Sequence, residues 1–170
     1  MFACTKKVPL SQLTTIVMGQ SPSSDSYNTD GEGIPFYQGS GEFTDKYVGP
    51  GMYCTSPTRF AEAGDVLMSV RAPVGTVNIT KEKCCIGRGL AAIRSNISAD
   101  YNEFFFYAFR AMADELSAMG HGSTVLAITK NELHGIMMPN ASPSEQLAFL
   151  ELAQQSDKSK YLTQKIIRMR

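Results

Sequence analysis

The side chains that most often do chemistry in proteins are few in this chain, and they are not grouped. It has four cysteines and two histidines, and no CxxC pair or other metal-ligand spacing links them. Cys84 and Cys85 are adjacent in an apolar, strand-like run, so we interpret them as buried free thiols. His121 lies in a glycine-rich loop without a nucleophile beside it in the sequence. These residues predict neither a metal centre nor a covalent catalyst.

The sequence also lacks the short motifs of common enzyme classes. It contains no GxGxxG or GxxxxGK[ST] phosphate loop, no GxSxG nucleophile elbow and no HExxH zinc site. It also lacks the Asn-Pro-Pro-aromatic or Asp-Pro-Pro-aromatic tetrapeptide of amino-methylating DNA methyltransferases. We therefore expect a protein with no catalytic residues and no cofactor of its own.

The charge of the chain is balanced overall but unevenly distributed. A formal net charge of zero argues against a protein that holds DNA by bulk electrostatics, because neutralising phosphates needs a surplus of Lys and Arg. Between residues 66 and 94, however, the only acid is Glu82, and the basic residues are Arg71, Lys81, Lys83, Arg88 and Arg94. This run indicates either a basic stripe on a neutral protein or ordinary solvated surface.

Short apolar runs separated by turns indicate strands in the first half of the chain. The clearest strands are expected at residues 65–71, 76–80 and 90–94, and a short helix leading into a strand at 8–17. Loops this short favour a curled, mainly antiparallel sheet. The polar residues 19–33 predict a loop presented at the surface. Arg71 ends its strand, so we expect its side chain at a rim of the sheet.

Helices are expected in the second half of the chain. Asp100 and Glu103 resemble a capping box that opens a helix ending at Gly120, and the aromatic residues of this helix favour the core over base stacking. Thr129 is expected to cap a further short helix. The 170 residues, 43% hydrophobic, suffice for one core. The amino-terminal residues lack the apolar region of a signal peptide, and no stretch is apolar over a membrane-spanning length, so we expect a cytoplasmic protein.

The last segment carries three separate signals for the start of a helix. Ser142 suits the N-cap, Pro143 the first helical position, and Glu145 the acid of a capping box. No Gly or Pro follows, so the helix can continue for about 28 residues, or roughly 40 Å. The sequence thus predicts an α/β (α+β) domain over residues 1–141 and one long helix over residues 142–170.

Residues spaced alternately four and three apart give this helix a heptad seam with a polar middle. They are Ala148, Leu152, Gln155, Ser159, Leu162, Ile166 and Met169. The seam predicts a coiled coil in which two copies pair antiparallel, because that sense places the apolar end of one helix beside the apolar end of the other. The alternative is a long helix that packs back on its own domain.

Six segments follow one another along the chain: VPLSQLTTIVMGQSPSSDSYN, GIPFYQGSGEF, AGDVLMSVRAPVGTVNI, IGRGLAAI, GSTVLAITKNELHGIMMP and PSEQLAFLELA. In order and spacing they resemble the target-recognition module and following helix of type I restriction-modification specificity subunits. Each motif is short and glycine-rich, so the resemblance depends on their common order. The Pro-Pro that usually precedes the helix in this family is replaced here by MMPNASPSEQ.

The resemblance implies a non-catalytic, DNA-binding specificity subunit. Its recognition domain would read one half of a split target in double-stranded DNA, and its long helix would pair with another such helix. Full-length members carry two recognition domains and two helices, so this chain is expected to be either a half-subunit that forms a homodimer or part of a longer protein. Methyltransferase subunits would supply S-adenosylmethionine and the methyl transfer, and restriction subunits can join them.

Candidate DNA-binding residues then follow from their chemistry. Arg and Lys reach guanine acceptors or phosphates, Gln pairs with adenine, Ser and Thr bind either, and Tyr and His pack on sugars or bases. The candidates are Tyr37, Gln38, Ser40, Arg71, Arg88, His121, Ser123, Thr124 and Lys130. The partner subunits can supply many phosphate contacts, so a neutral reader is consistent with this function. The competing hypothesis is a non-enzymatic interaction adaptor that acts through the long helix.

Overall fold

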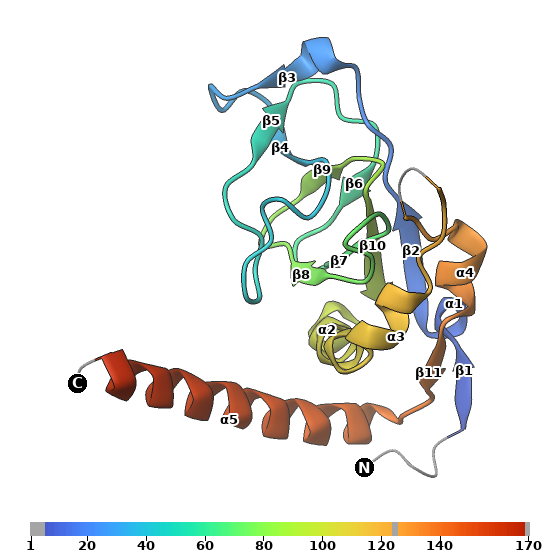
Figure 1. The fold of residues 1–170 in the computed structure, drawn as a ribbon, viewed down its shortest axis with the longest axis vertical. Helices are drawn as coiled ribbons and strands as arrows, with labels where there is room; N and C mark the ends of the chain where they lie inside the picture. Colours follow the sequence, from blue (N-terminus) through green and yellow to red (C-terminus); the bar gives the residue numbers. More distant parts are fainter. Residues whose placement is uncertain (1–5, 124–125, 169–170) are drawn as a thin grey trace.

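Within the residues that the structure describes, the strands form three sheets, and helices cover one end of the molecule (Figure 1). The computed structural model describes residues 6–123 and 126–168, with side chains up to residue 160. This mixed α/β architecture confirms the predicted fold class. The strands expected at 65–71, 76–80 and 90–94 are found as β7, β8 and β10 of one antiparallel sheet, and the other strands of the described residues form two further sheets.

The central sheet has four strands in the order β2-β10-β7-β8, and every pair is antiparallel. These strands are β2 (Thr14–Met18), β7 (Val66–Ser69), β8 (Val77–Ile79) and β10 (Leu90–Ser95). Helix α2 (Asn102–Ala111) packs against this sheet and buries Phe104, Phe105, Phe106 and Phe109 in the largest hydrophobic cluster. The aromatic residues of this helix are therefore core residues, as expected.

A second sheet of five short strands lies above the first in Figure 1, in the order β3-β5-β4-β9-β6. These strands are β3 (Tyr27–Asn28), β4 (Ile34–Tyr37), β5 (Met52–Cys54), β6 (Phe60–Ala61) and β9 (Cys84–Ile86). Strands β4 and β9 pair in parallel, and the others are antiparallel. Cys54, Cys84 and Cys85 are buried in this sheet as free thiols, which confirms the interpretation of the cysteine pair.

A small third sheet joins the two ends of the described domain. It pairs β1 (Lys7–Pro9) with β11 (Met137–Pro139), next to the short helices α1 (Leu10–Leu13) and α4 (Lys130–Gly135). Thr129 caps α4 in a full capping box with Glu132, as the sequence predicts. Two single turns, η1 (Ser24–Ser26) and η2 (Ala99–Tyr101), complete the connections.

The helix expected to run to Gly120 is interrupted. Helix α2 ends at Ala111, and α3 (Ala113–Ala118) starts after Met112, whose φ of −104° and ψ of 15° leave the helical region. The expected capping box of Asp100 and Glu103 is also wrong, because the turn η2 precedes α2 and no side chain caps that helix. Glu103 instead pairs with the ammonium group of Lys46 at 2.9 Å.

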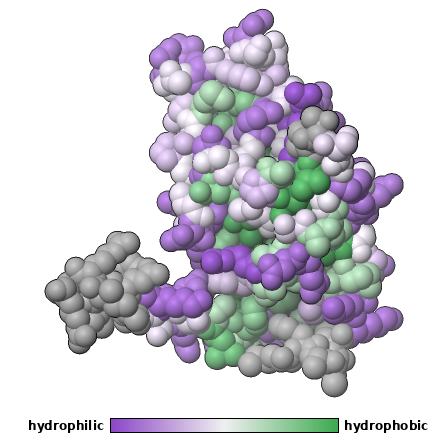
Figure 2. Space-filling model, viewed as in Figure 1, coloured by the Kyte–Doolittle hydropathy of each residue, from purple (hydrophilic) through white to green (hydrophobic). Residues whose placement is uncertain are grey.

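Helix α5 (Pro143–Arg168) extends away from the sheets along the bottom of Figure 1. Its start is the predicted capping box, in which Ser142 Oγ accepts from Glu145 N, and Glu145 Oε2 accepts from Ser142 N. The inward face buries Gln146 and Leu150, whereas Ala148 and Leu152 on the seam are exposed. Figure 2 shows hydrophobic side chains on the outer surface of this helix. The helix thus packs on its own domain along one face and presents another.

No helix within the described residues is long and apolar enough to cross a membrane. In the same part of the chain, no cluster of His, Cys, Asp and Glu could hold a metal ion.

Candidate nucleic-acid interface

The turn between β9 and β10 places Arg88 directly beside Gln38. Gly87 N donates to the carbonyl of Tyr37 at 2.8 Å, and Gly89 N donates to the carbonyl of Gln38 at 3.1 Å. A Cβ atom at Gly87 would lie 2.6 Å from Gln38 Oε1, which leaves no room for a side chain there. The two glycines therefore allow the backbone of the Gly-Arg-Gly turn to approach the backbone of Tyr37 and Gln38 closely. Arg88 and Gln38 are both exposed where the two segments meet.

Ser21 links these two residues, although no pattern in the sequence distinguishes it from the neighbouring serines. Its hydroxyl accepts from Gln38 Nε2 at 2.8 Å and from Arg88 N at 3.3 Å. Gln20 and Gly19 continue the contact, because their N–H groups donate to the carbonyls of Ile86 and Leu90. The polar composition of residues 19–33 is the one signal that pointed to this loop, and it does not identify a particular serine.

The backbone just before Arg71 is hydrogen-bonded to the same turn. Val70 N donates to the carbonyl of Gly89 at 2.9 Å, so the residue after it emerges next to the Gly-Arg-Gly turn. Arg71 is exposed, as predicted for a residue at the rim of the sheet. Ser69 Oγ donates to the Arg71 carbonyl at 2.5 Å, which fixes the backbone at this point.

The loop that follows α3 pairs with the Arg71 segment. Ala72 N donates to the carbonyl of Leu126, and Ile128 N donates to that of Val70, both at 2.9 Å. His121 closes the loop by exchanging two backbone hydrogen bonds with Ala127. The loop and α4 lie together on the right-hand side of Figure 1.

Helix α4 brings Lys130 to this side of the protein. His121 Nδ1 lies 3.5 Å from Glu132 Oε1, and Lys130 is exposed at the start of the same helix. Hydrogen bonds from the backbone and hydroxyl of Thr129 lower the pKa of Glu132, so its carboxylate remains charged beside His121. We call the exposed residues on this side the recognition surface: Gln38, Arg71, Arg88, His121, Ser123 and Lys130.

Three of the predicted site residues are not part of the recognition surface. Tyr37 is buried at 4% exposure and donates its hydroxyl to the Gly49 carbonyl at 3.1 Å, so it supports the fold instead of presenting its ring to a ligand. Ser40 is half-buried in the loop after β4. Thr124 lies outside the described residues.

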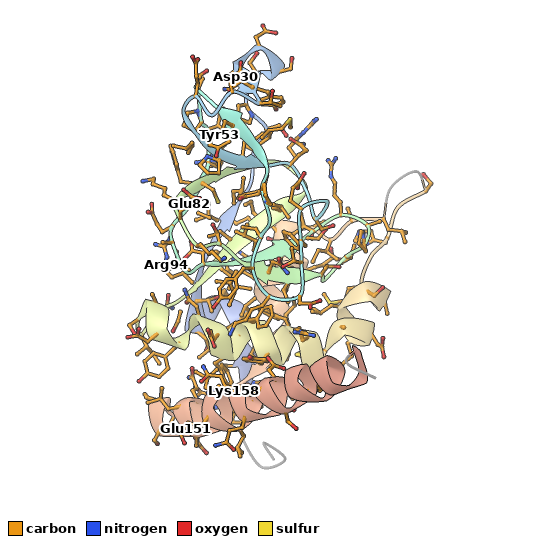
Figure 3. The ribbon with its side chains drawn as sticks, turned by 90° about the vertical axis from the view of Figure 1, so that its left-hand side faces the viewer. Asp30, Tyr53, Glu82, Arg94, Glu151 and Lys158 are labelled. Atoms are coloured by element: carbon orange, nitrogen blue, oxygen red, sulfur yellow. The ribbon has the colours of Figure 1, made fainter. Side chains whose placement is uncertain are left out.

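The basic run from residue 66 to 94 is divided by the fold. Arg94 makes two 2.7 Å hydrogen bonds to the buried carboxylate of Asp65, and Lys83 pairs with Glu62 at 3.0 Å. Figure 3 shows Arg94 and Glu82 along the left-hand edge of its view. Among the described residues, the ion pairs of the protein involve Lys46, Lys83, Arg94 and His121. Arg71, Arg88 and Lys130 are outside these pairs and are available to an anionic partner.

Comparison with known proteins assigns this architecture to a family. Residues 5–167 match the family described as type I restriction modification DNA specificity domain. The chain is 47% identical over 133 residues, 78% of its length, to a Methanocaldococcus jannaschii protein named as a specificity subunit of the type I restriction enzyme MjaX. That alignment covers 31% of the relative, so the chain spans about a third of its length.

Solved structures show the same similarity. The HsdS subunit of Thermoanaerobacter tengcongensis matches with a TM-score of 0.78 and 38% identity, over 94% of this chain and 39% of that one. A chain from a structure on complex assembly of the type I R-M system matches with a TM-score of 0.80 and 39% identity, over 94% of this chain and 40% of that one. The S subunit of M. genitalium, at 14% identity and a TM-score of 0.69, shares the fold. The chain therefore belongs to the family of type I restriction modification DNA specificity domains.

Proposed function

We propose that this chain reads one half of a bipartite DNA target as the recognition domain of a type I specificity subunit. The observation that carries the proposal is the recognition surface. Its exposed side chains come from four separate segments, which backbone hydrogen bonds tie into one rigid unit. A rigid scaffold favours the reading of base edges. Side chains that are already held in place lose less conformational entropy on binding than loosely held ones.

The chemistry of the recognition surface fits the major groove of DNA. Arg71 and Arg88 can each donate two hydrogen bonds to the O6 and N7 acceptors of guanine, and Gln38 can pair with N6 and N7 of adenine. Lys130 and Ser123 can bind phosphates or bases, and His121 can pack on a sugar or base. The hydrogen bonds to Ser21 orient Gln38 in the free protein, so it is partly preorganised.

The rest of the assembly follows from the same proposal. Residues 1–141 are the reader, and residues 142–170 are the helix that pairs with another copy and docks methyltransferase subunits. The chain performs no chemistry, and the methyltransferase subunits supply S-adenosylmethionine and many of the phosphate contacts. This division accounts for a chain whose net charge is zero. Restriction subunits complete the assembly where nuclease activity is present.

The test begins with the target itself, selected from a pool of random duplexes in the presence of the methyltransferase subunits. Arg71→Ala combined with Arg88→Ala is expected to weaken binding to the selected target at least about 30-fold, since each bidentate contact to a base contributes about 1–3 kcal/mol. The matched control is Lys81→Ala combined with Lys83→Ala, which removes the same charge from residues outside the recognition surface. It should change affinity by less than about threefold.

The outcome separates a reader from an adaptor. A reader keeps its preference for one sequence as salt concentration rises, because base contacts do not depend on counterion release. Weak, sequence-blind binding that disappears with salt would indicate an adaptor that acts through the long helix. Unchanged affinity of the Arg71 and Arg88 double variant for the selected target would contradict the assigned surface.

A further inference from the structure

Helix α5 is held against its own domain for about half of its length. Phe149 packs edge-on against Phe104, with ring centroids 5.7 Å apart, and Leu150 beside it is 6% exposed. Figure 3 shows α5 beneath α2, with Glu151 and Lys158 at the end of the molecule opposite to Asp30, and Figure 1, in which α2 is seen nearly end-on, shows that α5 crosses it. The apolar contacts explain why the helix binds to the domain. They are non-directional, so they do not by themselves fix its angle.

Farther along the helix, polar side chains make the contacts. Tyr107 donates its hydroxyl to Asp157 Oδ2 at 2.6 Å, and Gln154 Nε2 donates to Glu103 Oε2 at 3.0 Å. The other oxygen of Glu103 binds Lys46 Nζ at 2.9 Å, and this ammonium group also lies 5.5 Å from the Tyr107 ring centroid. We call these five residues the helix clamp. They join α5, α2 and the loop before Tyr47 through short, directional contacts.

The position of the helix clamp makes it effective against tilting. Asp157 is 14 residues beyond Pro143, or about 21 Å along the helix at 1.5 Å per residue. A contact at that distance from the start of the helix resists a change in angle far better than one near the start. Burial, followed by the hydrogen bond to Asp157, raises the pKa of Tyr107, so its hydroxyl remains a donor throughout the physiological range.

Small tilts matter because the helix is long. Its 26 residues extend about 39 Å, and a tilt of only about 5° moves the far end by roughly 3.4 Å. That displacement equals the rise of one base pair along DNA. A reader attached to a helix that tilts by this amount could not distinguish two half-sites separated by n base pairs from half-sites separated by n plus one.

We propose that the helix clamp sets the spacing between the two half-sites that the assembly accepts. This inference rests on the proposed function, in which two readers are joined by their long helices. The recognition surface selects the bases, and the clamp residues Glu103, Tyr107 and Asp157 select the distance by holding α5 at one angle. They are positioning residues, because they act on DNA only through the orientation of the domain.

The test measures binding of the assembled protein to duplexes that carry both half-sites at the preferred spacing and at one base pair more or less. The wild-type protein is expected to prefer one spacing by about tenfold over its neighbours, which corresponds to about 1.4 kcal/mol. Tyr107→Phe combined with Glu103→Ala should reduce this preference to about threefold or less. Affinity for a duplex with a single half-site should stay unchanged, because the recognition surface is untouched.

Matched variants separate positioning from general damage. Asp157→Asn keeps an oxygen that can accept from the Tyr107 hydroxyl and should keep the spacing preference, whereas Asp157→Ala should lose part of it. Ser156→Ala, at the exposed neighbouring position, should behave as wild type. An unaltered spacing profile in the Tyr107 and Glu103 double variant, or a wild type that tolerates all spacings of its target, would overturn the inference. A wild type without any sequence preference would instead overturn the proposed function.

Discussion

The arginine side chains of this protein differ in the partners that they contact. Arg94 is fixed by two hydrogen bonds to Asp65, a carboxylate only 1% exposed, and removing Arg94 would leave this buried carboxylate without its counterpart. Arg71 and Arg88 are exposed at the junction of several backbone segments. The first arginine stabilises the domain, and the other two are suited to an external anion.

Sequence alone could not make this distinction between arginines. Asp65 and Arg94 are 29 residues apart, and only the pairing of β7 with β10 brings them together. The same holds for Ser21, because the contact that gives it a role crosses 67 residues to Arg88. Residue type indicates which chemistry is available, whereas the partners of each side chain are set by the sheet.

Cys84 allows a prediction at the level of one residue. Burial raises the pKa of this thiol to about 11 from an ordinary value of 9.0. The unfolded chain therefore loses the proton first, and folding stability present below pH 9 should fall as pH rises toward 11, by up to about 1.4 kcal/mol per pH unit. Urea unfolding under reducing conditions at pH 8, 9 and 10 measures this loss.

The comparison variant is Cys84→Ala, which removes the titrating group from the same buried position. Its unfolding midpoint should fall less steeply with pH than that of the wild type. Burial also raises the pKa of Tyr37, to about 12, so some alkaline loss remains in the variant. If the unfolding midpoints of the two proteins fell equally steeply with pH, Cys84 would not contribute to the loss of stability at alkaline pH.

At the scale of elements, local signals succeeded where the contacts themselves are local. The cap at Thr129 and the capping box at Ser142 form as predicted, because in each the two partners are three residues apart. The similar pattern at Asp100 failed because the carboxylate of Glu103 is bound by Lys46 and Gln154. Tertiary contacts thus overrode a local preference.

The short strands were harder to predict for a related reason. Strands β3 and β6 have two residues each, too few for any alternation of apolar and polar side chains to be visible. They exist because longer-range pairing with β5 and β9 provides their hydrogen bonds. The break at Met112 was equally hidden, since neither Gly nor Pro marks it.

The N-cap of α5 gives a prediction for this element. Ser142→Ala should lower the free energy of unfolding by about 1 kcal/mol, because it leaves backbone donors of the first turn without their acceptor. Hydrogen bonds from Ser142 also lower the pKa of Glu145, so that the carboxylate stays charged and the box stays intact at neutral pH. Chemical unfolding followed by circular dichroism measures the change.

Two further variants control for the loss of a serine. Ser142→Asp retains a side-chain oxygen at the N-cap and should stay within a few tenths of a kcal/mol of wild type. Ser156→Ala, in the exposed middle of the helix, should also be close to neutral or slightly stabilising. A loss in Ser142→Ala no larger than the change in Ser156→Ala would show that the cap is unimportant.

At the scale of the whole molecule, the exposed face of α5 is the basis for a prediction about assembly. Leu152 on the seam is 50% exposed and Leu147 nearby is 45% exposed, while the opposite face of the same helix is buried in the domain. Charge is also divided along the helix. Acids come first, at Glu145, Glu151 and Asp157, and bases follow at Lys158, Lys160, Lys165 and Arg168.

This division of charge favours antiparallel pairing of two copies. In an antiparallel pair, Glu151 of one chain would lie near Lys165 of the other. Ala148 and Leu152 would meet the segment that contains Ile166 and Met169. Parallel pairing would align like charges and place both readers at one end. An antiparallel pair is two-fold symmetric, so identical readers would face the two halves of a palindromic, split target.

The prediction is that the protein is a dimer, with a mass near twice 18.6 kDa by light scattering. Leu162→Asp combined with Ile166→Asp should give the monomer mass, because each helix would then bury two charges in the seam. The sense of pairing is tested by charge exchange at low salt. Glu151→Lys should weaken the dimer, and adding Lys165→Glu should restore it only if the helices are antiparallel, since only then do these two positions face each other. A monomeric wild type, or a dimer unaffected by the aspartates, would exclude this interface.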